Sequence, residues 1–278
     1  MARVILKLGD GFQFMAAHSF FHDLTALERN PGRAAILLTG AWFMLLALFY
    51  ALPQIDIDVA QLFFFRTACS PEHAAAVCGT FPLSKNGFLG AVRKLLFYMP
   101  HVAGVVVLVA LIIGLRRARG MADRKHLQPL FLALTSVMIG PYLLVNMYLK
   151  EDWGRPRPNQ TDLFGGHLAF VPAGSPFGTC DQNCSFISGE AAGAGWLICL
   201  LPLLPVRARR FLGLPIIVVS LLTPLLRVSF GAHYLSDAVL GWLSSPVVFA
   251  IVVAVAQWQE RRKNRRSASG SAPSSTGE

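Results

Sequence analysis

Residues 129–149 read Pro129-Leu-Phe-Leu-Ala-Leu-Thr-Ser-Val-Met-Ile-Gly-Pro-Tyr-Leu-Leu-Val-Asn-Met-Tyr-Leu149, a run without a charged side chain. A helix needs about 20 apolar residues to cross about 30 Å of hydrocarbon, so this run predicts a membrane span. The whole chain is 54% hydrophobic and 14% charged. Soluble domains carry about 25% charged residues, so the composition predicts a membrane protein.

Five other apolar stretches also have a length that suits a helix. The six predicted spans lie at about 34–53, 96–115, 129–149, 186–204, 211–226 and 238–257. Only helices and closed barrels satisfy the backbone in lipid, and these lengths favour helices. The fifth span is short and contains Pro215 and Pro224, so its limits are soft. We therefore expect an all-α membrane protein, a bundle of six transmembrane helices.

Basic residues predict the orientation of this bundle. They gather in the N-terminal arm and in clusters at 116–125, 207–210 and 261–266, so that 17 of the 25 Lys and Arg residues lie on one side and eight on the other. This bias predicts cytoplasmic termini. The expected parts are an arm at 1–33, a membrane domain at 34–257 and a basic, then disordered tail at 258–278. No nucleic-acid recognition motif accompanies the net charge of +10, so we do not expect nucleic-acid binding.

Four cysteines fall in the two long loops on the non-cytoplasmic side. Cys69 and Cys78 lie in the first loop, and Cys180 and Cys184 lie in the second. An oxidising compartment would allow disulfides, and four cysteines permit three pairings. We favour Cys69–Cys78 and Cys180–Cys184, with four free thiols as the alternative. The spacing lacks the Cys-x2-Cys and paired histidines of a zinc site, so we expect no metal.

A group of cations follows the span at 129–149. The chain continues Lys150-Glu-Asp-Trp-Gly-Arg155-Pro-Arg157-Pro158, where the prolines prevent the helix from continuing. The resulting turn can direct Lys150, Arg155 and Arg157 at one phosphoryl group, which arginine binds in a planar, bidentate manner. The alternative is an ordinary basic cluster at a membrane edge.

A serine and a glycine open the next span, in the stretch Cys184-Ser-Phe-Ile-Ser188-Gly189-Glu190. Backbone N–H groups at a helix N-terminus bind anions, and glycine permits their close approach. Ser188 can add a hydroxyl donor. A simple helix cap is the alternative reading.

The third stretch is Arg227-Val-Ser-Phe-Gly-Ala-His233-Tyr-Leu-Ser-Asp237. His233 and Asp237 are four residues apart at the start of the sixth span, and this spacing places them on one face of a helix. A carboxylate that holds one imidazole nitrogen leaves the other free to act as a nucleophile or base. A buried His–Asp pair with no chemical role is the alternative.

Together the three stretches resemble the signature of the type 2 phosphatidic acid phosphatase superfamily, Lys-x6-Arg-Pro, Pro-Ser-Gly-His and Ser-Arg-x5-His-x3-Asp. The first motif is complete, and Arg227, His233 and Asp237 match the third. The sequence departs from the signature at three positions, where Leu226 replaces the serine, Ile187 the proline and Glu190 the histidine.

The resemblance implies roles for these residues and no cofactor. His233 would be the nucleophile that forms a phosphohistidine, and Asp237 would orient it. The phosphate ligands would be Lys150, Arg157, Ser188, Gly189 and Arg227, with Arg155 a further candidate. Glu190 stands where the family's histidine protonates the leaving group. It is a working general acid, or the leaving group needs little protonation, or the enzyme is impaired.

The second loop, with Phe164-Gly-Gly-His167 and Cys180-x3-Cys184, is similar to the lipid A 4′-phosphatase branch of this superfamily. The resemblance implies a bacterial inner-membrane phosphatase for a lipid phosphate, with a periplasmic active site, and makes His167 a candidate for substrate contact. Undecaprenyl pyrophosphate, phosphatidylglycerophosphate and phosphatidic acid are alternative substrates. A lipid phosphotransferase and a non-catalytic lipid-phosphate binder are alternative functions, and the sequence does not predict an oligomeric state.

Overall fold

The computed structural model describes residues 30–69, 77–149 and 153–270, without the side chains of Ala122 and of residues 268–270. The chain divides into two compact units. Residues 38–249 form the larger unit, which holds all the site residues discussed below, and the described residues 30–37 and 250–270 belong to the other.

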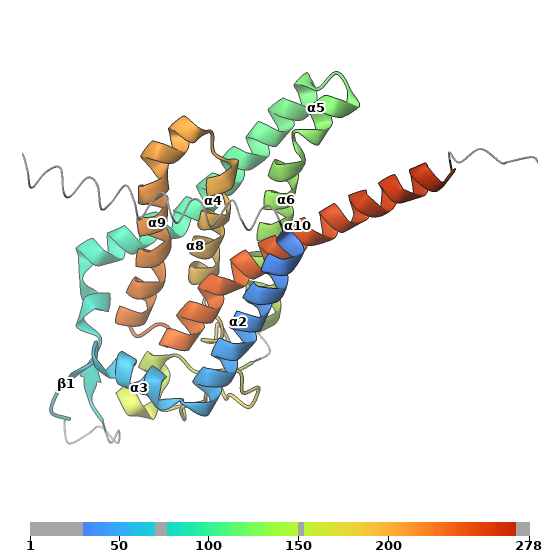
Figure 1. Cartoon of the computed structure of the whole chain (residues 1–278). Coiled ribbons are helices and arrows are strands. Elements are labelled where there is room, and N and C mark those ends of the chain that lie inside the picture. The colour runs from blue at the N-terminus through green and yellow to red at the C-terminus, as the bar shows by residue number, and fades with distance from the viewer. Residues whose placement is uncertain (1–29, 70–76, 150–152, 271–278) are drawn as a thin grey trace, which may run out of the picture. The chain divides into compact units, whose positions relative to one another are not determined.

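The described chain is mostly helical, and Figure 1 shows the long helices of the larger unit. The helices are α2 (Pro31–Ala51), α3 (Gln54–Gln61), α4 (Gly87–Arg117), α5 (Met121–Lys125), α6 (Gln128–Val137), α8 (Gly189–Cys199), α9 (Val206–Ser229) and α10 (Leu235–Gly270). Short 3₁₀ turns are η1 (Pro82–Lys85), η3 (Pro158–Gln160), η4 (Asp162–Phe164) and η5 (Leu201–Leu203), and η2 (Met138–Leu149) is a π-helix that continues α6.

Each of the six predicted spans contains a helix, but their lengths differ from the prediction. In the described part of the chain, five helical segments are long and apolar enough to cross a membrane: Pro31–Ala51, Gly87–Arg117, Asp123–Leu149, Val206–Ser229 and Leu235–Ser267. The fourth predicted span is a shorter apolar helix, Gly189–Leu203. The described residues therefore contain five candidate spans and one shorter apolar helix, which agrees roughly with the predicted bundle of six helices.

Small residues explain the position of α8 inside the bundle. Residues 191–199 are all buried, and α8 packs against α4, η2 and α9. A Cβ on Gly195 would lie 2.1 Å from the carbonyl oxygen of Trp242, so only glycine permits this approach to α10. Ser245 Oγ of α10 also donates a hydrogen bond to the Ala192 carbonyl at 2.6 Å. Burial of α8 holds its N-terminus, Ser188-Gly189-Glu190, in a defined place.

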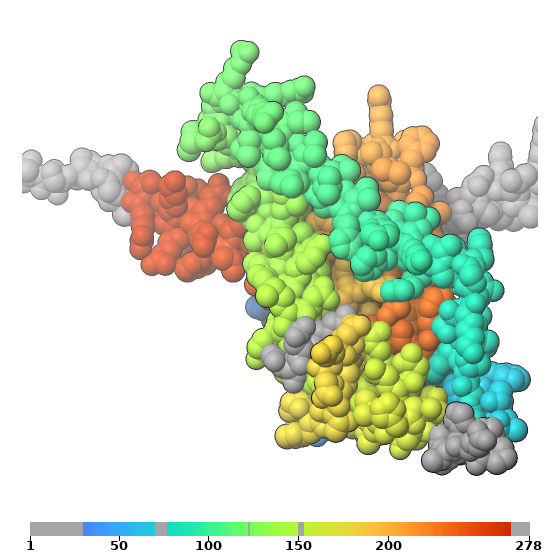
Figure 2. All heavy atoms as spheres, turned by 180° about the vertical axis from the view of Figure 1, so that it is seen from behind, coloured from blue at the N-terminus to red at the C-terminus, as the bar shows by residue number. Residues whose placement is uncertain are grey.

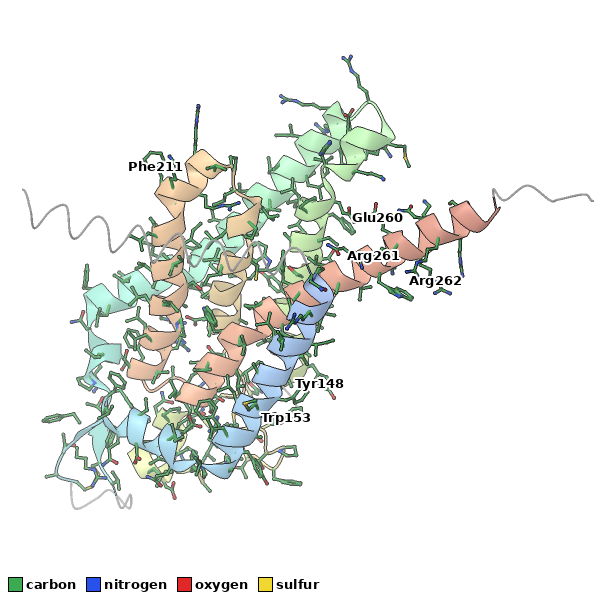
Figure 3. The ribbon with its side chains drawn as sticks, viewed as in Figure 1. Tyr148, Trp153, Phe211, Glu260, Arg261 and Arg262 are labelled. Atoms are coloured by element: carbon green, nitrogen blue, oxygen red, sulfur yellow. A yellow bond between two sulfur atoms is a disulfide. The ribbon has the colours of Figure 1, made fainter. Side chains whose placement is uncertain are left out.

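The π-helix η2 leads to the first predicted motif. Asn146 Nδ2 donates a hydrogen bond to the carbonyl oxygen of Pro141 at 2.8 Å, inside the widened turns. The rings of Tyr148 and Trp153 have centroids 6.5 Å apart and lie next to each other in Figure 3. Lys150 stands between these two residues in the sequence but lies outside the described residues.

The first long loop folds into small elements. Strands β1 (Phe65–Arg66) and β2 (Gly79–Thr80) pair antiparallel, and a disulfide joins Cys69 to Cys78 with a Cα–Cα distance of 5.3 Å. This is the pairing that we favoured from the sequence. The second loop, drawn yellow-green to yellow, gathers at one end of the larger unit in Figure 2. A cluster of aromatic side chains joins the two loops, namely Phe64, Phe81, Phe164 and Tyr234.

Candidate active site

The end of α9 positions the predicted histidine next to the predicted arginine. The helix ends in a left-handed residue, Gly231, with φ +64°. The carbonyl oxygen of Arg227 then accepts hydrogen bonds from the backbone N–H groups of Ala232 at 3.1 Å and His233 at 3.3 Å. A Cβ on Gly231 would lie 2.3 Å from the ring of Phe81, so glycine is required there for both reasons.

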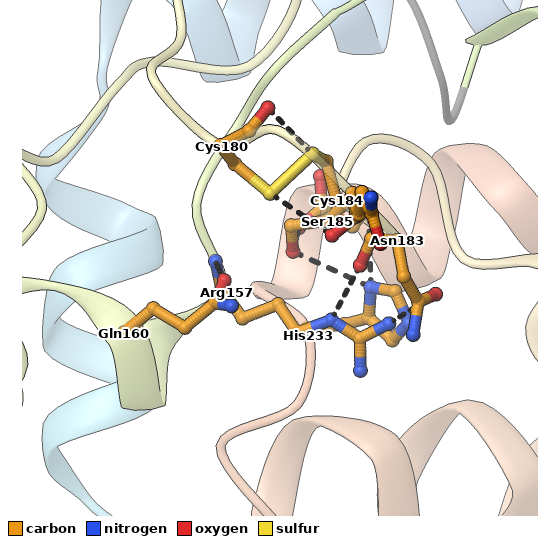
Figure 4. Close-up of a disulfide and its surroundings, with 9 residues drawn as sticks. Arg157, Gln160, Cys180, Asn183, Cys184, Ser185 and His233 are labelled. Carbon is orange, nitrogen blue, oxygen red and sulfur yellow. Dashed lines mark hydrogen bonds between the residues drawn. A yellow bond between two sulfur atoms is a disulfide. The ribbon is translucent and has the colours of Figure 1, made fainter.

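The His233 imidazole is 2% exposed, and its Nδ1 faces the backbone at Ser185. Its Nδ1 lies 2.9 Å from the Ser185 carbonyl oxygen, which can only accept a hydrogen bond, so Nδ1 carries the proton (Figure 4). The lone pair of the neutral ring is then on Nε2. This is the arrangement that a nucleophilic histidine requires.

Ser185 connects this histidine to the predicted carboxylate. Ser185 Oγ donates a hydrogen bond to Asp237 Oδ2 at 2.5 Å and lies 3.4 Å from His233 Nδ1. Asp237 Oδ2 also accepts the backbone N–H of Tyr234 at 3.0 Å. His233 precedes α10, and its Nδ1 contacts the Ser185 carbonyl, so the two side chains do not share a helix face as predicted; Ser185 lies between the imidazole and Asp237.

Arg155 does not have the role that we considered for it. Its guanidinium is fully buried, and each of its three nitrogens already donates to a protein acceptor. Nη1 donates to Asp237 Oδ1 at 2.6 Å, Nη2 to Asp56 Oδ2 at 2.8 Å and Nε to the Val171 carbonyl at 2.8 Å. Burial alone would lower the pKa of Arg155, but the charges of Asp237 and Asp56 outweigh it and raise the pKa. Arg155 is a structural cation, and the suggestion that it binds phosphate was wrong.

Asp56 is part of the same buried network and was missed from the sequence. It lies on α3, is 0% exposed and also accepts the Ser236 backbone N–H at 2.8 Å and the Ser236 hydroxyl at 2.5 Å. It therefore caps the N-terminus of α10, where a negative charge is favourable. The only sequence signal was a carboxylate directly after an apolar span.

Arg157 is held by the loop that the second disulfide closes (Figure 4). Cys180 and Cys184 are bonded with a Cα–Cα distance of 5.8 Å, the pairing that we favoured. Asn183 within this loop has φ +50° and accepts from Arg157 Nε at 3.0 Å through its carbonyl and from Nη2 at 2.8 Å through its side chain. Burial lowers the pKa of Arg157, opposed by the charges of Glu190 and Asp237. The loop thus holds the Arg157 guanidinium beside the segment whose Ser185 contacts His233.

Ser188 and Gly189 form the N-terminus of α8, as predicted from their order in the sequence. Ser188 Oγ accepts the Ala191 N–H at 3.3 Å, and Ser188 N–H donates to the Asp237 carbonyl at 3.0 Å. Ser188 is therefore a helix cap, and these contacts place the end of α8 next to α10. A Cβ on Gly189 would lie 2.2 Å from Asn146 Oδ1, so glycine is needed for close packing.

Glu190 forms ion pairs with two arginines. Arg93 donates through Nε to Glu190 Oε2 at 3.1 Å and through Nη2 to Oε1, a bidentate pair. Arg227 Nε lies 3.5 Å from Oε1 and has no hydrogen-bond partner in the described part of the chain, although it is buried. Arg93 was not selected from the sequence, because the predicted span began near residue 96 whereas α4 begins at Gly87.

No side-chain hydrogen bond or ion pair between described residues joins His167 to the residues above. His167 is exposed on the second loop, where its backbone N–H donates to the Gln160 carbonyl at 3.0 Å. Among the described residues, no group of three or more His, Cys, Asp or Glu side chains could hold a metal ion.

The chain is similar to several known proteins. The family model described as PAP2 superfamily matches residues 125–262. A lipid A 4′-phosphatase of Rhizobium etli is 49% identical over 83% of this chain and 90% of its own, and one of Rhizobium leguminosarum is 48% identical over 82% and 99%. A lipid A 4′-phosphatase of Francisella tularensis subsp. novicida is 30% identical over 73% and 89%.

A solved structure is also similar, that of a transmembrane PAP2-type phosphatidylglycerolphosphate phosphatase from Bacillus subtilis. It is 16% identical, covers 80% of this chain and 96% of its own, and has a TM-score of 0.47. The curated relatives match this chain over most of their own length. The chain is a multi-pass membrane protein and belongs to the PAP2 superfamily.

Proposed function

We propose that this protein is a lipid A 4′-phosphatase that works through a phosphohistidine on His233. One observation carries the chemistry: a buried imidazole with Nδ1 bonded to a carbonyl oxygen lies in a site that also holds Arg157 and Arg227. The substrate is proposed from the relatives of 48–49% identity, which carry this name.

In this mechanism Nε2 of His233 attacks phosphorus, and the N–P bond forms while the bond from phosphorus to the lipid oxygen breaks. The leaving oxygen takes a proton. Water then attacks phosphorus, the N–P bond breaks, and inorganic phosphate and neutral imidazole are released. The network Asp237–Ser185 stabilises the positive charge that the ring carries while it is phosphorylated. Arg157, Arg227 and Lys150 contact the phosphoryl oxygens. These contacts become stronger as negative charge develops on the oxygens in the transition state.

Glu190 is the proposed donor of the proton to the leaving oxygen. Its pair with Arg93 uses both carboxylate oxygens as acceptors, so the donor role requires that this pair opens and that the carboxylate takes up a proton from water before the lipid oxygen leaves. Glu190→Gln, Glu190→Ala and Glu190→His test this step through single-turnover phosphate release. Full activity of the Gln and Ala variants would eliminate Glu190 as the general acid.

The proposed location is the bacterial inner membrane, with both termini in the cytoplasm and the active site in the periplasm. The excess of basic residues at one end of the spans and the two disulfides in the loops at the other end support this orientation. Alkaline phosphatase fused after residue 270 should be inactive, and fused within the second loop it should be active. The opposite pattern would reverse the topology.

Phosphate release from purified lipids tests the function. The panel is lipid A with a 4′-phosphate, undecaprenyl pyrophosphate, phosphatidylglycerophosphate and phosphatidic acid, each presented in the same detergent. We expect the highest kcat/KM with lipid A and none with His233→Ala. A higher kcat/KM with another lipid of the panel would overturn the proposal that lipid A is the substrate. Phosphate recovered on a second lipid would indicate a transferase, and a lipid-binding function that survives in His233→Ala would indicate a binder.

A further inference from the structure

One of the two arginines that pair with Glu190 comes from outside the three motifs. Arg93 lies on α4, whereas the family model matches only residues 125–262. Its guanidinium nevertheless reaches Glu190 in the first turn of α8, directly after the Ser188-Gly189 pair that begins this helix. The side chain of Arg93 is 34% exposed, compared with 11% for Glu190 and 7% for Arg227. Arg93 is thus the solvent-accessible member of this group.

The charges of this group leave an excess that suits a phosphate monoester. Arg93, Arg157 and Arg227 interact electrostatically with Glu190 and with one another. Arg93 and Arg227 form ion pairs with Glu190, and Arg157 adds a third cation, so these four side chains carry two net positive charges. A phosphate monoester carries about −1.5 to −2 at neutral pH, and its oxygens offer guanidinium the same bidentate geometry as a carboxylate. Arg227 Nε, which is buried without a hydrogen-bond partner in the described chain, can serve such an anion.

We propose that Arg93 is a further phosphate-binding residue, and that Glu190 competes with the substrate phosphate for the guanidinium groups of Arg93 and Arg227. This inference rests on the proposed function and extends its site to α4. When the phosphate binds, Arg93 exchanges its carboxylate partner for phosphoryl oxygens. The released Glu190 then lies beside the phosphate, where the leaving oxygen must be protonated.

The competing explanation is that Arg93 acts only by positioning Glu190. The two explanations predict different phosphate affinities when the Glu190 carboxylate is absent. If Arg93 contacts the phosphate, its removal weakens phosphate binding even in a Glu190→Gln protein. If Arg93 only holds Glu190, its removal has no further effect there. Coupled pairs of this kind are resolved by a double-mutant cycle.

The experiment measures inorganic phosphate binding to the full chain in detergent, by calorimetry in the His233→Ala background and as product inhibition in active protein. Glu190→Gln should bind phosphate more tightly, because the competing carboxylate is gone. Adding Arg93→Gln to Glu190→Gln should weaken binding by about tenfold or more, the usual loss for a hydrogen bond to a charged group. Arg93→Lys should retain part of the affinity, and its melting temperature verifies folding.

Lys94→Gln is the matched control, because it removes one charge from an exposed neighbour on the same helix. It should leave phosphate affinity unchanged. The proposal would be overturned if Glu190→Gln and the double variant Arg93→Gln/Glu190→Gln bound phosphate with equal affinity. Weaker phosphate binding by Glu190→Gln than by the protein that retains Glu190 would also overturn it. If the proposed function alone is wrong, no lipid releases phosphate, while the phosphate-binding differences among these variants persist.

Discussion

Replacing Asp56 by alanine should be among the most destabilising single changes outside the catalytic motifs. The carboxylate is 0% exposed, forms an ion pair with Arg155 at 2.8 Å and accepts two hydrogen bonds from Ser236. Breaking a buried ion pair costs about 3–5 kcal/mol, because the other charge stays buried without compensation. Arg155 keeps Asp237 and the ring of Tyr234, 4.6 Å away, so the lower limit of about 3 kcal/mol applies.

The Ser236 backbone N–H at the start of α10 adds to this cost. Its loss of an acceptor contributes about 1 kcal/mol, which brings the total to about 4 kcal/mol. At roughly 2–4 °C per kcal/mol for a chain of this size, the melting temperature should fall by roughly 8–16 °C. Thermal unfolding of the purified protein in detergent, followed by circular dichroism, measures this shift.

Asp58 provides the matched control on the same short helix. It is exposed, and its carboxylate accepts a hydrogen bond from Gln54 at 2.7 Å, so Asp58→Ala should change stability by less than about 0.5 kcal/mol. Asp56→Asn keeps an acceptor for Ser236 but loses the charge, so its melting temperature should lie between those of the two alanine variants. If Asp56→Ala and Asp58→Ala have the same melting temperature, the buried network does not stabilise the fold as reasoned.

Three further outcomes are expected. Gly231→Ala should lower kcat at least tenfold and reduce the melting temperature, because φ is +64° and the new Cβ would meet Phe81 at 2.3 Å; unchanged kcat would contradict the role of this turn. Cys184→Ser should raise KM more than it lowers kcat, because the opened loop no longer holds Arg157; steady-state kinetics would contradict this if only kcat fell. Burial raises the pKa of Tyr234 above its ordinary value, so the folded state keeps the phenol proton when the unfolded state has lost it, and stability should fall as pH rises above about 10. Melting temperatures from pH 8 to 11 should show this fall in the wild type and less of it in Tyr234→Phe, and parallel curves would contradict it.

Much of the site could be predicted because its signals are local. The motif at 227–237 was recognised from its spacing, although Arg227 ends α9 and His233 follows the turn at Gly231 instead of lying on the next helix. The order Ser188-Gly189 likewise predicted a helix N-terminus, which the structure contains. For Arg155 the sequence signal was ambiguous, because the same basic residue suits a phosphate or a buried carboxylate. Only its partners Asp56 and Asp237 decide between them.

The sequence by itself determined the class of this protein, since hydrophobic length, basic clusters and motif spacing are properties of short segments. It indicated an all-α membrane protein with its predicted phosphate-handling residues near the ends of apolar helices. The tertiary structure alone decided which distant charges meet. Arg93 reaches Glu190 across 97 residues, and Arg155 reaches Asp56 across 99. Charged groups inside a packed bundle need partners, but the pattern of a sequence does not say which partner the packing of the helices will bring within reach.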